Sequence, residues 1–315
     1  MTLFDSASLA HDEAGAEAGP GTSRRARRST PGVEAGPDAE QPCRPDHADA
    51  GVDGARADLV RLCLVVAYDG SGFRGFAPQE GQRTVAGELS RAISTVAGHP
   101  VELVCAGRTD AGVHASGQVV HVDVRSDLST KRLSKAVNAM LGPAIVVRSA
   151  GEAPPGFDAR RSARARWYRY LVLRSDTPDP LLAPLAWNVR DDLELRSMIC
   201  ASDSLLGEHD FSAFCRRPPG VPADQPITRR VLDARWTRLE TAGCRLADGE
   251  CLLRFDISAQ SFAHQMVRSI VGTLVEVGRG KRPASDVSWL LRCGDRSLVK
   301  TIAPPHGLCL VGVDY

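Results

Sequence analysis

Asp110 is the residue of this chain whose surroundings best suit chemistry. It lies in the run from Cys105 to Ala115, which reads CAGRTDAGVHA and separates two apolar segments typical of strands. Gly107 and Gly112 permit backbone angles and close approaches that a side chain would block, so a ligand could reach the carboxylate. A purely structural alternative is an Asx-type turn in which Asp110 caps its own backbone.

Two neighbours of Asp110 add binding and acid-base groups to this loop. Arg108 has the planar fork of donors that grips phosphate, and its charge would keep a nearby carboxylate ionised. His114 could act as a general base, although a lone histidine in a loop is more often a hydrogen-bonded structural residue. No serine or cysteine nucleophile is convincingly paired with His114, so Asp110 is the predicted centre of the chemistry.

A segment that combines arginines with aromatic residues lies further along the chain. Residues 160–174 contain no acidic residue. Their basic and aromatic side chains are Arg160, Arg161, Arg164, Arg166, Trp167, Tyr168, Arg169, Tyr170 and Arg174. Basic groups grip phosphates and aromatic rings stack on bases, so this pattern predicts contact with a nucleic acid. The alternative is a strand that exposes an arginine face to solvent.

The first 58 residues differ in composition from the rest of the 315-residue chain. They are rich in Ala, Gly, Asp, Glu and Pro and poor in large apolar residues, which predicts a disordered tail. This tail holds 6 arginines and 11 acidic residues, which leaves 33 basic and 27 acidic residues in 59–315. The body is therefore the basic part, which suits a local surface that contacts phosphates.

Cysteine usage and hydropathy restrict the compartment and the cofactors. The nine cysteines are scattered without a C-x-x-C pair, which predicts reduced thiols rather than disulfides or a zinc site. Glu208, His209 and Asp210 are adjacent, and three adjacent residues of an extended chain do not converge on a metal, so we predict a loop there. Because no stretch is apolar enough to span a bilayer and no signal peptide is visible, we expect a cytoplasmic protein.

The periodicity of apolar residues predicts two α+β halves joined by residues 151–160. The first half follows a β-α-β-β-α-β order, with strands over 61–68, 101–105, 117–124 and 144–149 and helices over 84–97 and 130–140. The second half has strands over 166–174, 229–239, 251–259 and 308–313 and helices over 192–206, 262–278 and 285–293. We therefore predict a tail over 1–58 and domains over 59–155 and 156–315. Their antiparallel sheets lie side by side with a central cleft, and Pro-rich 216–225 forms a mobile loop.

The loop around Asp110 also resembles a known signature. The run from Ala106 to His114, followed by GQVVH, resembles that of the tRNA pseudouridine synthase A family, in which the aspartate of GRTDAGVH is catalytic. Further motifs follow in the family's order over residues 61–315: YDG and FRGF within 68–76, RWYRY at 166–170, SFAHQMVRSIVG at 261–272 and APPHGL at 303–308. The chain differs from the family's usual residues at Phe76, Ala77, Ala86 and Cys309, and these differences concern details of RNA contact.

The resemblance implies a fold and a reaction. The fold is that of the pseudouridine synthases, with a central RNA-binding cleft. The reaction breaks the bond from the ribose C1′ to N1 of uracil, rotates the base and joins C1′ to C5, and it needs no cofactor. Asp110 would be the nucleophile toward C1′ or the base that starts glycal formation, and the sequence leaves both routes open. The expected partner is tRNA, with uridines 38 to 40 of the anticodon arm as targets, and the expected assembly is a homodimer.

The same resemblance implies roles for other residues. Tyr168 would stack beneath the uracil and is a candidate base for the C5 proton, and its alternative is a half-buried strand tyrosine. Arg268 lies one turn after His264 on the predicted helix 262–278, at the edge of an apolar face, and needs a carboxylate partner, which by resemblance is Asp110. The alternative is a surface arginine without a partner. Arg108 would insert at the extruded nucleotide or grip its phosphate. Further substrate contacts are expected from His114, Arg160, Arg164, Arg166, Phe262 and His264.

Two other classes of function compete with this interpretation. A noncatalytic RNA-binding module could use the same duplicated pattern with aromatic residues on its sheet, but such a module does not need a carboxylate paired with arginine. An aspartic-protease-like loop could contain Asp110, but those enzymes need two such aspartates, and the second half has no matching DTG or DSG.

Overall fold

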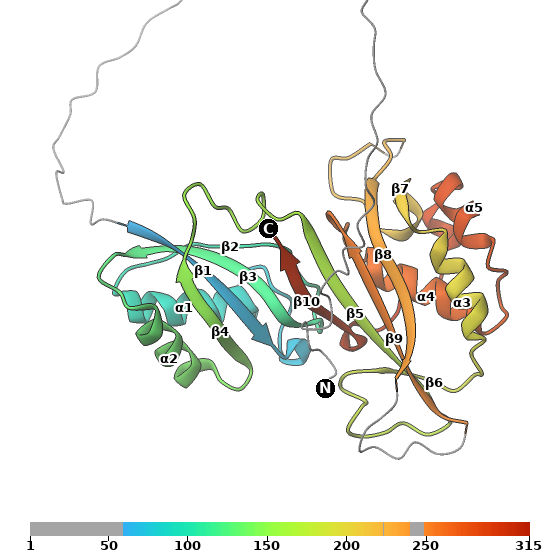
Figure 1. Ribbon diagram of the computed structural model, residues 1–315, viewed down its shortest axis with the longest axis horizontal. Coiled ribbons are helices and arrows are strands. Elements are labelled where there is room, and N and C mark those ends of the chain that lie inside the picture. Colours follow the sequence, from blue (N-terminus) through green and yellow to red (C-terminus); the bar gives the residue numbers. More distant parts are fainter. Residues whose placement is uncertain (1–58, 223, 240–248) are drawn as a thin grey trace, which may run out of the picture. The chain divides into compact units, whose positions relative to one another are not determined.

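Ten strands form one sheet in the computed structural model, which describes residues 59–222, 224–239 and 249–315 (Figure 1). The strand order is β4-β1-β3-β10-β5-β9-β8-β7, with β2 paired to β3 and β6 paired to β5. The predicted tail over 1–58 lies outside the described residues. The mixed α+β class predicted from the sequence is confirmed.

The first half contains four strands and two α-helices. The strands are β1 (Leu59–Tyr68), β2 (Leu103–Cys105), β3 (His114–Arg125) and β4 (Ile145–Glu152), and the helices are α1 (Val85–Ala97) and α2 (Thr130–Leu141). Buried residues alternate with more exposed ones along the end of β1, as a strand with one core face requires. Helix α1 begins where the Thr84 side chain accepts the backbone N–H of Gly87, and it ends at Gly98.

The second half contains six strands and three α-helices. The strands are β5 (Ala165–Arg174), β6 (Trp187–Val189), β7 (Gly207–Asp210), β8 (Thr228–Leu239), β9 (Cys251–Ala259) and β10 (Leu308–Asp314), and the helices are α3 (Leu195–Asp203), α4 (Met266–Gly278) and α5 (Asp286–Cys293). Single 3-10 turns form η1 (Gly70–Gly72), η2 (Ser212–Phe214), η3 (Arg296–Leu298) and η4 (Pro305–Gly307).

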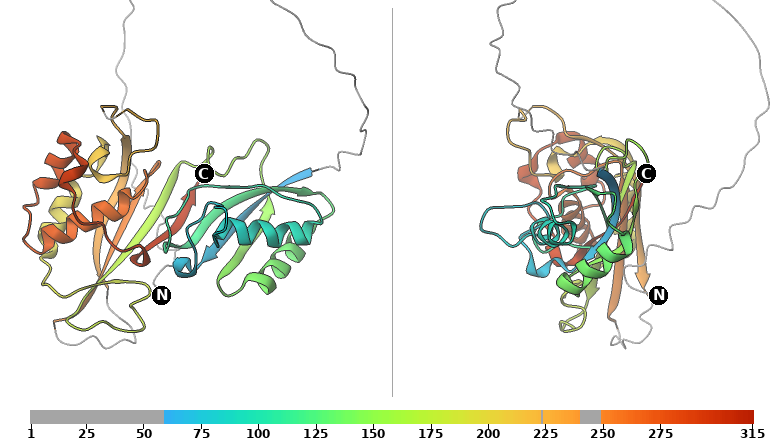
Figure 2. Two further views of the ribbon diagram at one scale, coloured as in Figure 1. Left: turned by 180° about the vertical axis from the view of Figure 1, so that it is seen from behind. Right: turned by 90° about the vertical axis from the view of Figure 1, so that its left-hand side faces the viewer.

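The last strand, β10, joins the two halves into a continuous sheet (Figure 1). It pairs parallel to β3 through Cys309 and Leu310, and antiparallel to β5 on its other side. One cluster of buried residues extends from β1 and β3 through β5 to β9 and α4. The helices of both halves therefore cover the same face of the sheet (Figure 2).

Two predictions about local structure are wrong. The helix expected from residue 262 begins only at Met266, because Gln265 adopts a left-handed backbone conformation with φ 63° that an α-helix cannot continue. Residues 207–210 form β7 rather than a loop, because they pair with β8. Strand β6 was not predicted, since its three residues show too short a pattern to detect. In the described part of the chain, no helix combines the length and apolarity needed to cross a bilayer.

Candidate active site

Asp110 lies in the loop between β2 and β3 and faces an arginine from α4. The Nη1 group of Arg268 donates to Oδ2 of Asp110 at 3.2 Å. The side chain of Asp110 is 23% exposed and that of Arg268 is 15% exposed, so the carboxylate remains accessible while the guanidinium is largely covered. Two hydrogen bonds join Arg268 to Ala303. The Nε of Arg268 donates to the Ala303 carbonyl at 2.8 Å, and the Ala303 N–H donates to the Arg268 carbonyl at 3.0 Å. These bonds fix the direction of the arginine.

The segment before α4 brings two further predicted residues to the site. His264 is exposed, and its Nε2 lies 3.4 Å from Oδ1 of Asp110. The ring of Phe262 packs edge-on against Tyr168, with centroids 5.1 Å apart and an interplanar angle of 87°. The late start of α4 therefore leaves both side chains on an irregular segment beside Asp110 and Tyr168.

Tyr168 is a buried residue of β5 whose environment favours the neutral phenol. Burial raises its pKa well above the ordinary value, and the negative charge of Asp110 acts in the same direction. A neutral phenol is the form that stacks on a base and donates a hydrogen bond, whereas a general base requires the phenolate. Tyr168 is therefore a neutral phenol in the folded protein.

Tyr68 and Phe76, at the end of β1 and shortly after it, support the loop that contains Asp110. The hydroxyls of Tyr68 and Thr109 share a hydrogen bond of 2.7 Å, and the N–H of Phe76 donates to the Thr109 carbonyl at 3.0 Å. Gln118 donates to the carbonyl of Gly107 at 2.6 Å. Sequence reasoning missed these supporting roles, although the presence of Tyr68 and Phe76 in family-like motifs was a signal for them.

His114 joins three segments through its ring. The N–H of Gly70 donates to Nδ1 at 3.2 Å, which leaves the proton on Nε2, and Nε2 donates to the Pro184 carbonyl at 3.2 Å. Oδ1 of Asp69 also lies 3.1 Å from Nδ1. The ring is buried, and these contacts support the structural interpretation of His114.

The six arginines of residues 160–174 divide into an engaged group and an exposed group. The guanidinium of Arg166 is buried and donates five hydrogen bonds to the carbonyls of Ala106, Arg160, Ala163 and Gln260. Arg169 pairs with Asp256 at 2.7 Å and Arg174 with Asp192 at 2.6 Å. Arg160, Arg161 and Arg164 are exposed. We expected Arg166 to contact the substrate, but these carbonyls occupy all five donors of its guanidinium.

The loop that presents the exposed arginines is anchored on the sheet. His121 accepts the N–H of Ala159 on Nδ1 at 2.9 Å, and the Tyr315 hydroxyl donates to the Ala159 carbonyl at 2.8 Å. Arg61 donates to the Phe157 carbonyl at 2.8 Å. Burial lowers the pKa of His121, and the Arg61 charge adds to this effect, so the ring stays neutral and able to accept. The arginines thus project from a fixed backbone.

Together these residues place a partly exposed carboxylate beside an arginine, two aromatic rings in edge-on contact and three exposed arginines. A carboxylate can attack an electrophilic carbon or remove a proton. In 59–222, 224–239 and 249–315, no cluster of three His, Cys or acidic side chains is arranged to hold a metal ion. Seven cysteines in these ranges are free thiols.

The chain is similar to known proteins over most of its length. The family model described as tRNA pseudouridine synthase matches residues 64–160 and 201–315. A protein of Methylobacterium sp. (strain 4-46) named tRNA pseudouridine synthase A is 45% identical over 258 residues, which cover 82% of this chain and 98% of that protein. A protein of the same name from Frankia casuarinae is 42% identical over 263 residues, covering 82% of this chain and 90% of that protein.

Proposed function

Because this chain belongs to the tRNA pseudouridine synthase A family, whose members are isomerases that convert uridine in tRNA to pseudouridine, we propose that Asp110 is its nucleophile. The observation that supports this proposal most is the contact of 3.2 Å between Asp110 and Arg268. Membership of an enzyme family sets aside the noncatalytic RNA-binding module and the aspartic-protease-like loop.

The proposed reaction starts at the bond between the ribose C1′ and N1 of uracil. Asp110 either attacks C1′ as this bond breaks, or removes the C2′ proton so that a glycal forms. The released uracil turns and its C5 bonds to C1′, while the bond from Asp110 to C1′ breaks or, in the glycal route, C2′ regains its proton. C5 then loses its proton and N1 gains one, so the product is an isomer of the substrate. Arg268 orients the carboxylate through its hydrogen bond of 3.2 Å. In both routes every atom of the product comes from the uridine, except for exchanged protons.

Other residues would bind and expose the target nucleotide. A uridine stacked in RNA must be extruded before Asp110 can reach C1′, which costs roughly a few kcal/mol. Tyr168 offers a ring for the extruded base, and Phe262 supports that ring edge-on. The exposed Arg108 would occupy the vacated stack or grip the phosphate, and His264 lies close enough to Asp110 to contact the ribose.

The exposed arginines would contact the RNA backbone beyond the target. Arg160, Arg161 and Arg164 share one anchored loop, and such side chains add affinity without reading sequence. Family resemblance supports uridines 38 to 40 of the anticodon arm as the targets, a homodimer as the assembly and the cytoplasm as the location.

Mapping of pseudouridine in tRNA tests this proposal directly. Unmodified tRNA is treated with the protein, derivatised with carbodiimide and copied by reverse transcriptase, which stops at pseudouridine. We expect new stops at positions 38 to 40 with the wild-type protein and none with Asp110→Asn. Stops elsewhere in the tRNA would contradict the proposed target, and stops of equal strength with Asp110→Asn would contradict the proposed nucleophile.

A further inference from the structure

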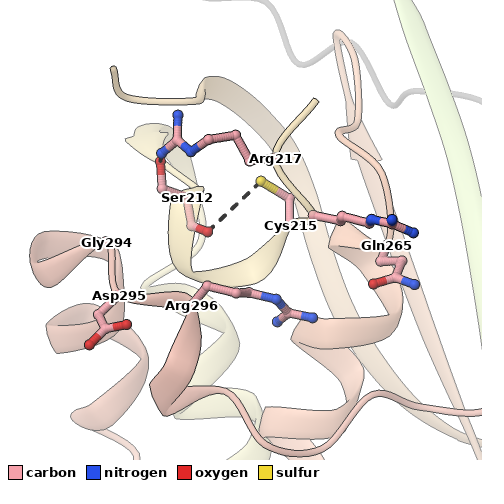
Figure 3. A pocket seen from close by; sticks show the side chains of 8 residues that line it. Ser212, Cys215, Arg217, Gln265, Gly294, Asp295 and Arg296 are labelled. Atoms are coloured by element: carbon pink, nitrogen blue, oxygen red, sulfur yellow. Dashed lines mark hydrogen bonds between the residues drawn. The ribbon is translucent and has the colours of Figure 1, made fainter. Parts of the chain in front are cut away.

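A pocket lined by arginines lies next to the candidate active site, in the second half of the chain. Its volume is about 370 Å³. Arg217 follows η2 and its side chain extends toward Ser212, whereas Arg296 enters from η3 and extends toward Gln265 (Figure 3). Arg216 also lines the pocket. The arginines come from two segments that are far apart in sequence, so only the fold brings them to one pocket.

The charge of this pocket suits an anion. Three arginines line it against one carboxylate, that of Asp295, which accepts the N–H of Ser297 at 2.8 Å. Arg296 is partly buried, and burial lowers the pKa of its guanidinium, which shows that it has lost solvation. Cys215 lines the same wall, and burial raises the pKa of its thiol, so the thiol adds no negative charge. Among the residues that the structure describes, no carboxylate forms an ion pair with Arg216, Arg217 or Arg296.

Hydrogen bonds within the protein hold two of the three pocket arginines in place. Arg217 donates to the carbonyls of Pro222 and Gln225 at 2.7 and 2.6 Å, and this closes the loop that it begins. Arg296 donates to the Ala213 carbonyl at 3.2 Å with one of its two Nη atoms. Arg216 is exposed and has no such contact among the described residues. The pocket therefore combines two fixed guanidinium groups with one that is free to close on a ligand.

His264 connects the pocket to Asp110. The N–H of Arg216 donates to the His264 carbonyl at 2.9 Å, while the His264 side chain reaches to 3.4 Å from Asp110. Gln265, the next residue, lines the pocket itself. His264 and Gln265 therefore connect the wall of the pocket to the segment beside Asp110.

We propose that the pocket formed by Arg216, Arg217 and Arg296 binds a backbone phosphate of the substrate RNA, next to the nucleotide that enters the active site. This inference rests on the proposed function, because it takes the RNA strand to pass Asp110. It adds a specific phosphate site to the exposed arginines of residues 160–164, in a different part of the fold. Its selectivity is for charge and position rather than for base identity.

Arg216→Gln is the most direct test, because this side chain is exposed and the variant should fold. Binding to unmodified tRNA is measured at several salt concentrations in an Asp110→Asn background, so that no chemistry occurs. We expect the magnitude of the salt slope to fall by roughly 0.7 to 0.9. Arg292→Gln is the matched control, since Arg292 is an exposed arginine of α5 that does not line the pocket.

Phosphate ethylation of the tRNA locates the contact. We expect ethylation of a phosphate adjacent to the target uridine to block binding by the parent protein, and this interference to disappear with Arg216→Gln but to persist with Arg292→Gln. Equal salt slopes and identical interference patterns for the two variants would overturn the proposal. If the proposed function were wrong, the wild-type protein would form no pseudouridine. The binding measurements would still show whether the pocket contacts a phosphate, so the two failures can be distinguished.

Discussion

Arg268 and Asp110 are 158 positions apart in the chain, and the fold places the guanidinium Nη1 of one 3.2 Å from the carboxylate Oδ2 of the other. The contact joins the loop of the first half to a helix of the second, so the candidate site exists only when both halves are assembled. Ala303 holds the arginine from its other side. The pair therefore depends on three separate segments.

Asp110→Asn should abolish turnover while it preserves binding. The amide keeps the shape of the carboxylate but removes the charge that attacks carbon or takes a proton, so pseudouridine formation should fall by more than about a thousandfold. Single-turnover assays and tRNA affinity measure the two effects separately. A variant that keeps a tenth of the wild-type rate would argue against Asp110 as the nucleophile.

Arg268→Met and Arg160→Gln should have opposite effects on rate and binding. The first removes the partner of Asp110 and should reduce the rate at saturating tRNA with little change in the salt dependence of affinity. The second removes one exposed positive charge and should lower the magnitude of the salt slope by roughly one unit with a normal saturating rate. If Arg268→Met instead changed only affinity and its salt slope, Arg268 would be another phosphate contact.

Arg166→Lys should lower the rate of pseudouridine formation. It should not weaken the electrostatic attraction of tRNA, because lysine keeps the positive charge. Arg166 ties the carbonyl of Ala106, where the Asp110 loop begins, to that of Gln260, just before Phe262. Lysine keeps the positive charge but not the planar fork of five donors, so the two segments should lose their alignment. We expect a lower rate at saturating tRNA, an unchanged salt slope and a lower thermal midpoint. A reduced salt slope with a normal rate would mean that Arg166 contacts RNA after all.

Stability should decrease as the pH falls through the titration range of His121. Its pKa is lowered from 6.5 in the folded protein, so the unfolded chain binds more protons between the two pKa values. The contribution of the neutral ring is therefore present above about pH 6.5 and is lost as the pH falls below this value. Arg61, Asp123 and Asp158 are the charged groups that act on this ring.

Thermal midpoints between pH 7.5 and 5 measure this effect. We expect His121→Gln to show a smaller loss over this range than the wild-type protein. The pKa of His306 is also lowered by burial, so part of the loss should remain in the variant. His209→Gln serves as a control and should follow the wild-type curve. Identical curves for all three proteins would show that His121 does not titrate in this range.

Local sequence patterns determined the elements and the position of the reactive loop. Alternating and helical periodicities depend on near neighbours in the chain, so the ranges of β1, α1, α2, β9 and α5 agree with prediction to within about two residues. Asp110 was identifiable because a glycine-flanked carboxylate between two strands is itself a local pattern. The class of the fold followed from the order of these elements.

Tertiary structure decided which groups are free and which are engaged. The pattern of residues 160–174 did not distinguish the exposed Arg160 from Arg166, whose donors are occupied by carbonyls of distant segments. The sequence also did not reveal the break at Gln265 that leaves His264 beside Asp110. Nor did it reveal the parallel pairing of β10 with β3 that joins the halves. Each of these features depends on groups that are far apart in the chain, and a hydrogen bond or ion pair forms only where the fold brings donor and acceptor within about 3 Å.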